Sequence, residues 1–219
     1  MDARQLASHL EHTLLRPEAR RADIEAACQL SRELGCAAVC INPIWVALAR
    51  ELLEGSGVKV VAVVGFPFGA TPSAVKAFET EQAVRDGADE IDMVLAIGQL
   101  RDGELALVEA DIATVVHAAD DRPVKVVLEC GLLSDDQKRR AVDLAARAGA
   151  AYVKTSTGFL GSGATLHDVR LLHRAAGGRL RVKATGGIRF FEDAVALLEA
   201  GASRLGTSHS PTVLASRDG

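Results

Sequence analysis

The chain has 219 residues, of which 48% are hydrophobic and 25% are charged, and its formal net charge is −4. A chain of this length can bury one sizeable core and falls within the size range of single-domain α/β barrels. Acidic and basic residues are mixed along the whole length, which argues against nucleic acid as a partner. We find neither a run of about 18 apolar residues that could span a membrane nor a signal peptide. We therefore expect one domain, residues 1–219, in the cytoplasm.

The cysteines and histidines do not suggest a disulfide framework or a metal centre. The four cysteines contain no C-x-x-C pair, and a chain of this length needs no disulfide staples. The six histidines contain no H-E-x-x-H motif and form no cluster at a metal-ligand spacing. We therefore expect reduced thiols and no metal.

Short β-branched segments alternate with helical segments along the chain. The predicted strands are 12–15, which is the weakest, then 37–41, 58–66, 90–95, 124–130, 151–157, 181–187 and 203–207. Between them, segments such as 24–34, 73–86, 134–148 and 191–200 have helical periodicity. Several helices end in a glycine just before the next strand, at Gly35, Gly87, Gly149 and Gly201, where a left-handed cap lets the chain reverse.

This alternation predicts an α/β fold with a single (β/α)₈ TIM barrel. An open doubly wound sheet is the alternative. It would require a G-x-G-x-x-G turn after the first strand, and the sequence has none there.

Three predicted strands carry a charged residue between apolar neighbours. Asp92 lies within Glu-Ile-Asp-Met-Val-Leu, Lys154 within Tyr-Val-Lys-Thr-Ser, and Lys183 within Arg-Val-Lys-Ala-Thr. Because side chains alternate along a strand, the apolar neighbours face the helices and these three residues face the barrel interior. One interpretation is a structural ion pair between Asp92 and one lysine, but it leaves the second lysine buried without a partner.

The other interpretation is catalytic. A free lysine is almost entirely protonated at neutral pH. Burial and a second ammonium nearby lower a lysine pKa and make the amine a nucleophile. Two lysines and one carboxylate at the mouth of a barrel provide such an arrangement.

The ends of the last two predicted strands are rich in glycine. Thr-Gly-Gly-Ile-Arg at 185–189 and Leu-Gly-Thr-Ser at 205–208 precede turns or helices at the same mouth. Exposed backbone N–H groups there would bind a phosphate. Two ordinary tight turns are the alternative interpretation.

Seven segments resemble deoxyribose-phosphate aldolase in order and spacing. They are Leu-Glu-His-Thr-Leu-Leu at 10–15, Val-Cys-Ile-Asn-Pro at 39–43, Gly-Phe-Pro at 65–67, Glu-Ile-Asp-Met-Val at 90–94, Val-Lys-Thr-Ser-Thr-Gly-Phe at 153–159, Val-Lys-Ala-Thr-Gly-Gly-Ile-Arg at 182–189 and Gly-Thr-Ser at 206–208. The resemblance spans nearly the whole chain, and the two lysine motifs together are highly specific. It implies a cofactor-free class I aldolase that cleaves 2-deoxy-D-ribose 5-phosphate into D-glyceraldehyde 3-phosphate and acetaldehyde.

The resemblance also implies roles for individual residues. Lys154 would form the Schiff base, Lys183 would lower its pKa and relay protons, and Asp92 would be the acid/base partner. Thr157 would contact a sugar hydroxyl. The phosphate would be bound by Gly186, Gly187, Arg189 and Ser208. A homodimer is compatible with the same resemblance.

Two residues depart from the family pattern. Glu11 stands where aspartate is usual, which puts its contact with the proton relay in question. His209 stands where a small residue is common, and we expect it to point to solvent rather than add charge beside the phosphate. Two other functions stay open, namely another Schiff-base phosphosugar aldolase or transaldolase-like barrel, and a non-catalytic phosphosugar-binding barrel.

Overall fold

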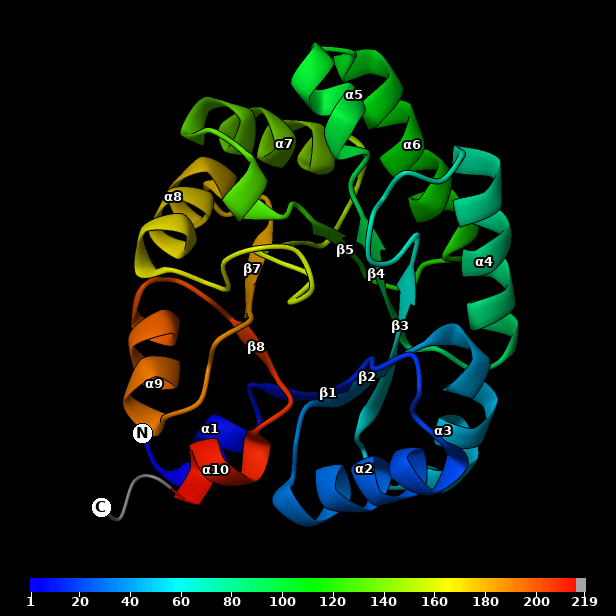
Figure 1. The fold of residues 1–219 in the computed structure, drawn as a ribbon, viewed down its shortest axis with the longest axis vertical. Helices are drawn as coiled ribbons and strands as arrows, with labels where there is room; N and C mark the ends of the chain where they lie inside the picture. Colours follow the sequence, from blue (N-terminus) through cyan, green and yellow to red (C-terminus); the bar gives the residue numbers. More distant parts are fainter. Residues whose placement is uncertain (216–219) are drawn as a thin grey trace.

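The computed structural model describes residues 1–215, in which eight parallel strands close into a barrel (Figure 1). The strands are β1 (Leu10–Leu14), β2 (Ala38–Ile41), β3 (Lys59–Val64), β4 (Glu90–Val94), β5 (Val124–Val127), β6 (Tyr152–Lys154), β7 (Arg181–Thr185) and β8 (Arg204–Thr207). Each strand pairs with the next, and β8 returns to β1 with Gly206 opposite Glu11. The predicted (β/α)₈ barrel is confirmed, and the open doubly wound sheet is excluded.

Helices surround the ring of strands (Figure 1). They are α1 (Ala3–Ala7), α2 (Arg21–Leu34), α3 (Val46–Leu52), α4 (Ser73–Arg85), α5 (Ile97–Asp102), α6 (Leu105–Ala118), α7 (Asp135–Arg147), α8 (Leu166–Ala176), α9 (Phe191–Glu199) and α10 (Ser210–Ala215), with 3₁₀ turns at Pro43–Trp45 and Cys130–Leu132. Among the described residues, no helix is both long and apolar enough to cross a lipid bilayer.

Local sequence signals explain where several helices begin and end. α7 begins with a capping box, because the Ser134 side chain accepts the Gln137 N–H and the Gln137 side chain accepts the Ser134 N–H. The four predicted reversal glycines all have positive φ, between 68° and 112°. At Gly201 a Cβ atom would also lie 2.4 Å from the His173 ring. Only glycine fits there.

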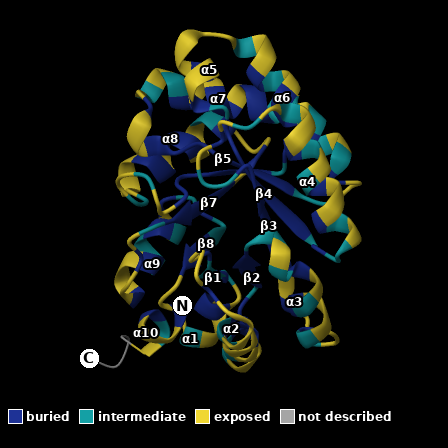
Figure 2. Cartoon of the chain, turned by 45° about the vertical axis from the view of Figure 1, so that its right-hand side comes forward, coloured by how far each residue is buried: buried dark blue, intermediate teal, exposed yellow. Residues whose placement is uncertain are grey.

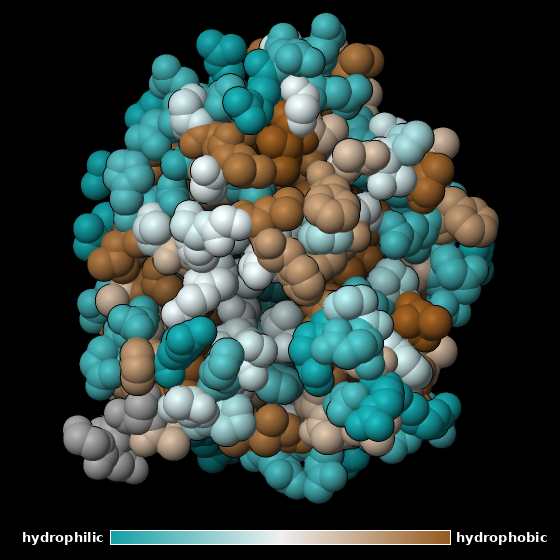
Figure 3. Space-filling view, viewed as in Figure 1, coloured by the Kyte–Doolittle hydropathy of each residue, from teal (hydrophilic) through white to brown (hydrophobic). Residues whose placement is uncertain are grey.

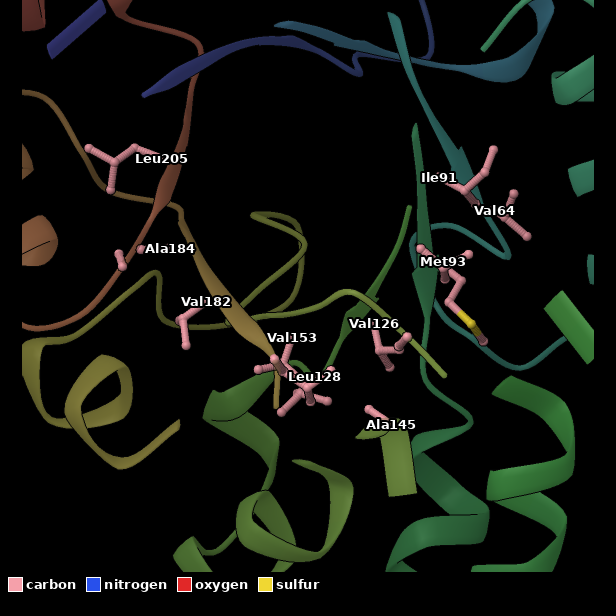
Figure 4. Close-up of a cluster of buried hydrophobic side chains, with 14 of the residues drawn as sticks. Val64, Ile91, Met93, Val126, Leu128, Ala145, Val153, Val182, Ala184 and Leu205 are labelled. Atoms are coloured by element: carbon pink, nitrogen blue, oxygen red, sulfur yellow. The ribbon is translucent and has the colours of Figure 1, made fainter. Parts of the chain in front are cut away.

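The hydrophobic core lies between the strands and the helices. Ile91 and Met93 on β4, Val153 on β6 and Ala184 on β7 all belong to it (Figure 4), which confirms the outward direction predicted for them. The strands are buried over most of their length, whereas the helices expose one face (Figure 2). The alternate side chains of the strands therefore point into the barrel.

Four predicted strands continue two or more residues too far at their C-terminal ends. The segments 58–66, 124–130, 151–157 and 181–187 end as strands at Val64, Val127, Lys154 and Thr185. The residues beyond these points form the loops of the barrel mouth. The polar side chains and the glycines of these loops belong to the site described next.

Candidate active site

Asp92 lies at the centre of a buried cluster of charged side chains inside the barrel. Its Oδ2 atom accepts hydrogen bonds from Lys154 Nζ at 2.8 Å and from Lys183 Nζ at 2.7 Å. Its Oδ1 atom accepts a third from Lys125 Nζ at 2.9 Å. All four side chains are at most 1% exposed. The fold thus brings the three predicted catalytic residues together, with both predicted lysines on one carboxylate oxygen.

Glu11 is a second carboxylate in this cluster. Its Oε2 atom accepts a short hydrogen bond from Lys183 Nζ, and its Oε1 atom lies 3.7 Å from Lys125 Nζ and 3.5 Å from Arg204 Nη1. The longer side chain at this position therefore does reach the lysine of the predicted relay. The predicted count of two lysines and one carboxylate is wrong, because Lys183 has two acidic partners and the positive charge inside the barrel is not in surplus.

Glu90 extends the cluster toward the N-terminal end of the barrel. It lies two residues before Asp92 on β4, so both side chains point to the same side of the strand. Its carboxylate lies 2.7 Å from Lys59 Nζ, 2.7 Å from Lys125 Nζ and 3.5 Å from Arg204 Nη2. Charges of alternating sign therefore connect Asp92 to the half-exposed Lys59 at the far end of the barrel.

The protonation states of the cluster follow from its geometry. Burial alone would raise the pKa of Asp92, but the ammonium groups of Lys125, Lys154 and Lys183 hold it well below its ordinary value. Burial alone would lower the pKa of Lys183, but Asp92 and Glu11 raise it above its ordinary value. At neutral pH Asp92 is therefore a carboxylate and Lys183 an ammonium. The single negative charge of Asp92 is shared by three lysines.

A cavity of about 280 Å³ opens at the mouth, where β1, β6, β7 and β8 end. All five predicted substrate-binding residues line it, namely Thr157, Gly186, Gly187, Arg189 and Ser208. Arg16 and the exposed His209 line it as well, and His209 Nδ1 lies 3.0 Å from Ser208 Oγ. The predicted catalytic residues do not line this cavity and are buried deeper, inside the barrel.

One wall of the cavity is apolar. Phe159 lines it and packs edge to face on Phe66, with 5.2 Å between ring centroids. In the space-filling view, apolar side chains gather over the side of α5 and α7, whereas the side of α2 and α10 is mostly hydrophilic (Figure 3). With Arg16 and Arg189 also lining it, the cavity suits a small molecule that has one anionic end and one uncharged end.

Close packing around two glycines holds the mouth in place. A Cβ atom on Gly206 would lie 2.5 Å from Thr185 Oγ1 and 3.3 Å from Lys183 Cε. A Cβ atom on Gly163 would lie 2.2 Å from the carbonyl oxygen of Gly186, which accepts the Ala164 N–H. Glycine at these positions lets the loop after β6 rest on the turn after β7 and leaves room for the Lys183 side chain.

Glu129 also lies at the mouth, just after β5, and is fully buried. Its Oε2 atom accepts hydrogen bonds from the backbone N–H of Thr157 at 3.0 Å and from the Thr157 hydroxyl at 2.5 Å. It thereby holds one of the cavity-lining residues.

The sequence prediction missed several charged residues of this region, among them Lys125, Glu90, Arg204 and Glu129. Lys125 lies between valines on a predicted strand, and Glu90 is two residues from Asp92. The two-residue alternation that selected Asp92 would have found both of them. The signal for Arg204 and Glu129 is weaker, since each lies at a strand end where the direction of a side chain is less certain.

Comparison with known proteins places this geometry in a family. Residues 2–209 match the model of the DeoC/LacD family aldolases. The chain belongs to this family. A relative named deoxyribose-phosphate aldolase, from Streptococcus pneumoniae serotype 19F (strain G54), is 51% identical over 210 residues, which cover 96% of each chain. The family predicted from the seven sequence segments is confirmed.

Solved structures of the family share the fold closely. A putative deoxyribose-phosphate aldolase from Coccidioides immitis superimposes with a TM-score of 0.96 at 37% identity, covering 98% of this chain and 86% of the other. The deoxyribose phosphate aldolase from Aeropyrum pernix, described as a unique tetramer, gives a TM-score of 0.91 at 34% identity and covers 97% and 91%.

Proposed function

We propose that this aldolase reversibly cleaves 2-deoxy-D-ribose 5-phosphate to D-glyceraldehyde 3-phosphate and acetaldehyde, as a step of deoxyribonucleoside breakdown. The observation that carries the proposal is the pair of lysines, Lys154 and Lys183, bonded to the same oxygen of Asp92 below a cavity lined by arginine and glycine. The deoxyribose-phosphate aldolase that is 51% identical to this chain supports the choice of substrate.

Lys154 is the nucleophile in this mechanism. The positive charge of Lys183 disfavours a second positive charge on the Lys154 amine, whereas the negative charge of Asp92 favours it. Asp92 bonds Lys125 and Lys183 as well as Lys154, so only part of its charge acts on the Lys154 amine. The neutral amine attacks the aldehyde carbon C1, and loss of water gives an iminium ion. The electron sink is thus made from the protein's own lysine, so the reaction requires no metal or cofactor.

Turnover then needs two proton transfers, one from the C3 hydroxyl and one to C2. A base takes the C3 hydroxyl proton while the C2–C3 electrons move to the iminium nitrogen and glyceraldehyde phosphate leaves. We assign this step to Asp92, directly or through a water, once Lys154 has lost its ammonium protons and no longer bonds Asp92 as strongly. Lys183 protonates the enamine at C2 and regains its proton through Asp92. Hydrolysis of the new iminium releases acetaldehyde and restores Lys154.

The far end of the sugar is held by its phosphate. Backbone N–H groups at Gly186 and Gly187, the Arg189 guanidinium and the Ser208 hydroxyl supply donors along one side of the cavity. Binding there orients the reacting carbons over Lys154. Such a phosphorylated, charged substrate does not cross a lipid bilayer unaided, so we place the enzyme in the cytoplasm, where the substrate is retained.

We further propose that the protein forms a homodimer. Phe68, Val75, Phe78 and Leu107 are each at least half exposed, and the adjacent helices α4 and α6 carry three of them. Exposed apolar groups of this kind are typical of contacts between subunits. Light scattering on the eluting protein should give twice the mass of one chain. The mass of a single chain would contradict the dimer.

The proposed function is tested by a retro-aldol assay on deoxyribose 5-phosphate beside unphosphorylated deoxyribose. We expect cleavage of both, with kcat/KM for the phosphorylated sugar higher by two orders of magnitude or more, since a phosphate bound by several charge-assisted hydrogen bonds contributes roughly 3 kcal/mol. In Arg189→Ala most of this preference should be lost. Absence of cleavage would overturn the proposal, and equal rates on the two sugars would overturn the phosphate site.

The two alternative functions predict different results. A transaldolase-like barrel would need only one lysine and would transfer a larger fragment than acetaldehyde. A non-catalytic binding barrel would bind deoxyribose 5-phosphate without cleaving it, and it has no use for two buried lysines on one carboxylate.

A further inference from the structure

Glu129 is a buried carboxylate that the proposed mechanism does not use. Its side chain is 0% exposed, and its Oε1 atom has no hydrogen-bond partner among residues 1–215. Removing a carboxylate from water while leaving one oxygen unpaired is unfavourable. A residue of this kind at the mouth of an enzyme barrel suggests a functional role.

The backbone directs Glu129 toward the site. Its φ and ψ are 54° and 65°, a left-handed conformation that favours glycine. The Leu128 N–H bonds the carbonyl oxygen of Lys154, and two residues later the Cys130 N–H bonds that of Thr155. The acceptor has advanced by one residue while the donor advanced by two. Glu129 is therefore an extra residue on the β5 side, just past the ends of the two strands, and this irregular backbone sets the direction of its side chain.

Glu129 determines whether the Thr157 hydroxyl can donate or accept a further hydrogen bond. That hydroxyl donates its hydrogen to Glu129 Oε2, and its oxygen accepts the Phe159 N–H at 3.1 Å. A hydroxyl has one hydrogen and two lone pairs, so one lone pair of Thr157 Oγ1 remains. Because Thr157 lines the cavity, it offers a bound molecule an acceptor and not a donor.

We propose that Glu129 is a positioning residue that sets Thr157 Oγ1 as the acceptor for the C4 hydroxyl of the substrate, so that the enzyme selects aldehydes carrying this hydroxyl. The inference rests on the proposed function. With C1 on Lys154 and the phosphate at Gly186 and Gly187, Thr157 faces the middle of the sugar, because it lies three residues beyond Lys154 and shares the cavity with both glycines. The C3 hydroxyl gives up its proton in the reaction, whereas the C4 hydroxyl keeps its hydrogen and can donate it.

A purely structural role for Glu129 predicts something different. The two hydrogen bonds to Thr157 also tie the loop after β5 to the loop after β6. If this tie were all that mattered, losing it would slow the reaction of every aldehyde alike. A positioning role changes the ratio between aldehydes that do and do not carry the hydroxyl.

The test is aldol addition of acetaldehyde to D-glyceraldehyde 3-phosphate and to 3-phosphooxypropanal, which lacks only the relevant hydroxyl. The unmodified enzyme should prefer the first by about tenfold or more in kcat/KM. Thr157→Val should remove this preference and Thr157→Ser should keep it. Glu129→Gln should reduce it, because a neutral amide is a weaker acceptor and, if rotated, donates to Thr157 instead.

A double variant tests most directly whether Glu129 acts through Thr157. If Glu129 acts through Thr157, the double variant E129Q/T157V should show the same preference as T157V alone. Glu79→Gln is the matched control, since Glu79 also accepts a loop N–H, but that of Gly65, which unlike Thr157 does not line the cavity. We expect it to leave the preference unchanged.

Three outcomes would overturn the inference: an unchanged preference in E129Q, equal loss on both aldehydes, or loss of preference in T157S. If E129Q does not fold, T157V still tests the inference, because a preference that survives in T157V would overturn it. Failure of the proposed function is seen separately, because acetaldehyde lacks this hydroxyl. Borohydride should trap acetaldehyde on Lys154 in E129Q as in the unmodified enzyme, and no trapping in either would refute the proposed function itself.

Discussion

Lys183 carries its charge between two carboxylates, Glu11 and Asp92, and this position determines the effect of its removal. Lys183→Leu takes away the ammonium that opposes charge on Lys154 and the acid proposed for C2. We expect turnover at neutral pH to fall by about 10²-fold or more, with the fold retained by circular dichroism. Lys59→Met, at the exposed end of the same charged cluster, is the control and should stay active. Near-normal turnover in Lys183→Leu would contradict the assigned role.

The direction of single side chains was predictable, but their partners were not. The two-residue repeat of a strand pointed Asp92, Lys154 and Lys183 into the barrel, and the structure has them there. Their partners depend on register and on the reach of long side chains across the closed barrel, as when Lys183 on β7 meets Glu11 on β1. Neither the register nor the reach of a side chain across the barrel can be read from the pattern of one strand. Glu129 was missed because the left-handed backbone after the end of β5, rather than the repeat, sets its direction.

At the scale of elements, one buried ion pair joins α4 to α6 outside the barrel. Lys76 Nζ bonds Asp111 Oδ2 at 2.6 Å and the carbonyl oxygen of Val94 at 3.0 Å, and Ser73 bonds the other Asp111 oxygen. Lys76→Met leaves a buried carboxylate with one neutral partner. We expect the free energy of unfolding in urea to fall by roughly 3–5 kcal/mol.

The double variant K76M/D111L separates loss of the pair from loss of packing. It removes both charges, so most of the lost stability should return. If the double variant were as unstable as Lys76→Met, the unpaired carboxylate would not be the cause.

The charges at the N-terminal end of β4 give the fold an acid-sensitive element. Burial alone would raise the pKa of Glu90, but Lys125, then Lys59 and Arg204, lower it from 4.5 to about 2. A carboxylate with a lowered pKa stabilises the folded state above its unfolded pKa and loses that contribution as the pH falls through its folded pKa. The free energy of unfolding should therefore decline between pH 4.5 and 2, and more steeply than in Glu90→Gln. Equal slopes would contradict the ion pairs of Glu90.

Most elements could be predicted because their signals are local. The helix 191–200 and the strand 90–95 differ from α9 and β4 by a single residue at one end, since alternation, capping and terminal glycines lie in the segments themselves. The overlong strands 151–157 and 181–187 had a physical cause. In 151–157 the β-branched Thr155 and Thr157 continue past the end of β6 at Lys154, and in 181–187 two glycines follow β7 into a loop held by tertiary contacts, such as that of Ala164 with Gly186.

At the scale of the whole molecule, the closed barrel couples all eight strands. Each strand pairs with two neighbours, and we propose that the chain is one domain. Urea unfolding should then give coincident transitions by circular dichroism and by fluorescence of Trp45, the only tryptophan, which packs against the core. Two separated transitions would contradict a single domain.

The central claim is that Lys154 forms the Schiff base, and borohydride trapping tests it most directly. The enzyme is incubated with acetaldehyde and borohydride, digested and examined by mass spectrometry, with Lys154→Ala and Lys183→Leu treated in parallel. Our account predicts one ethyl group on Lys154, none in Lys154→Ala, and no retro-aldol activity in that variant. A label on Lys183 in place of Lys154, no label at all, or cleavage that persists in Lys154→Ala would contradict it.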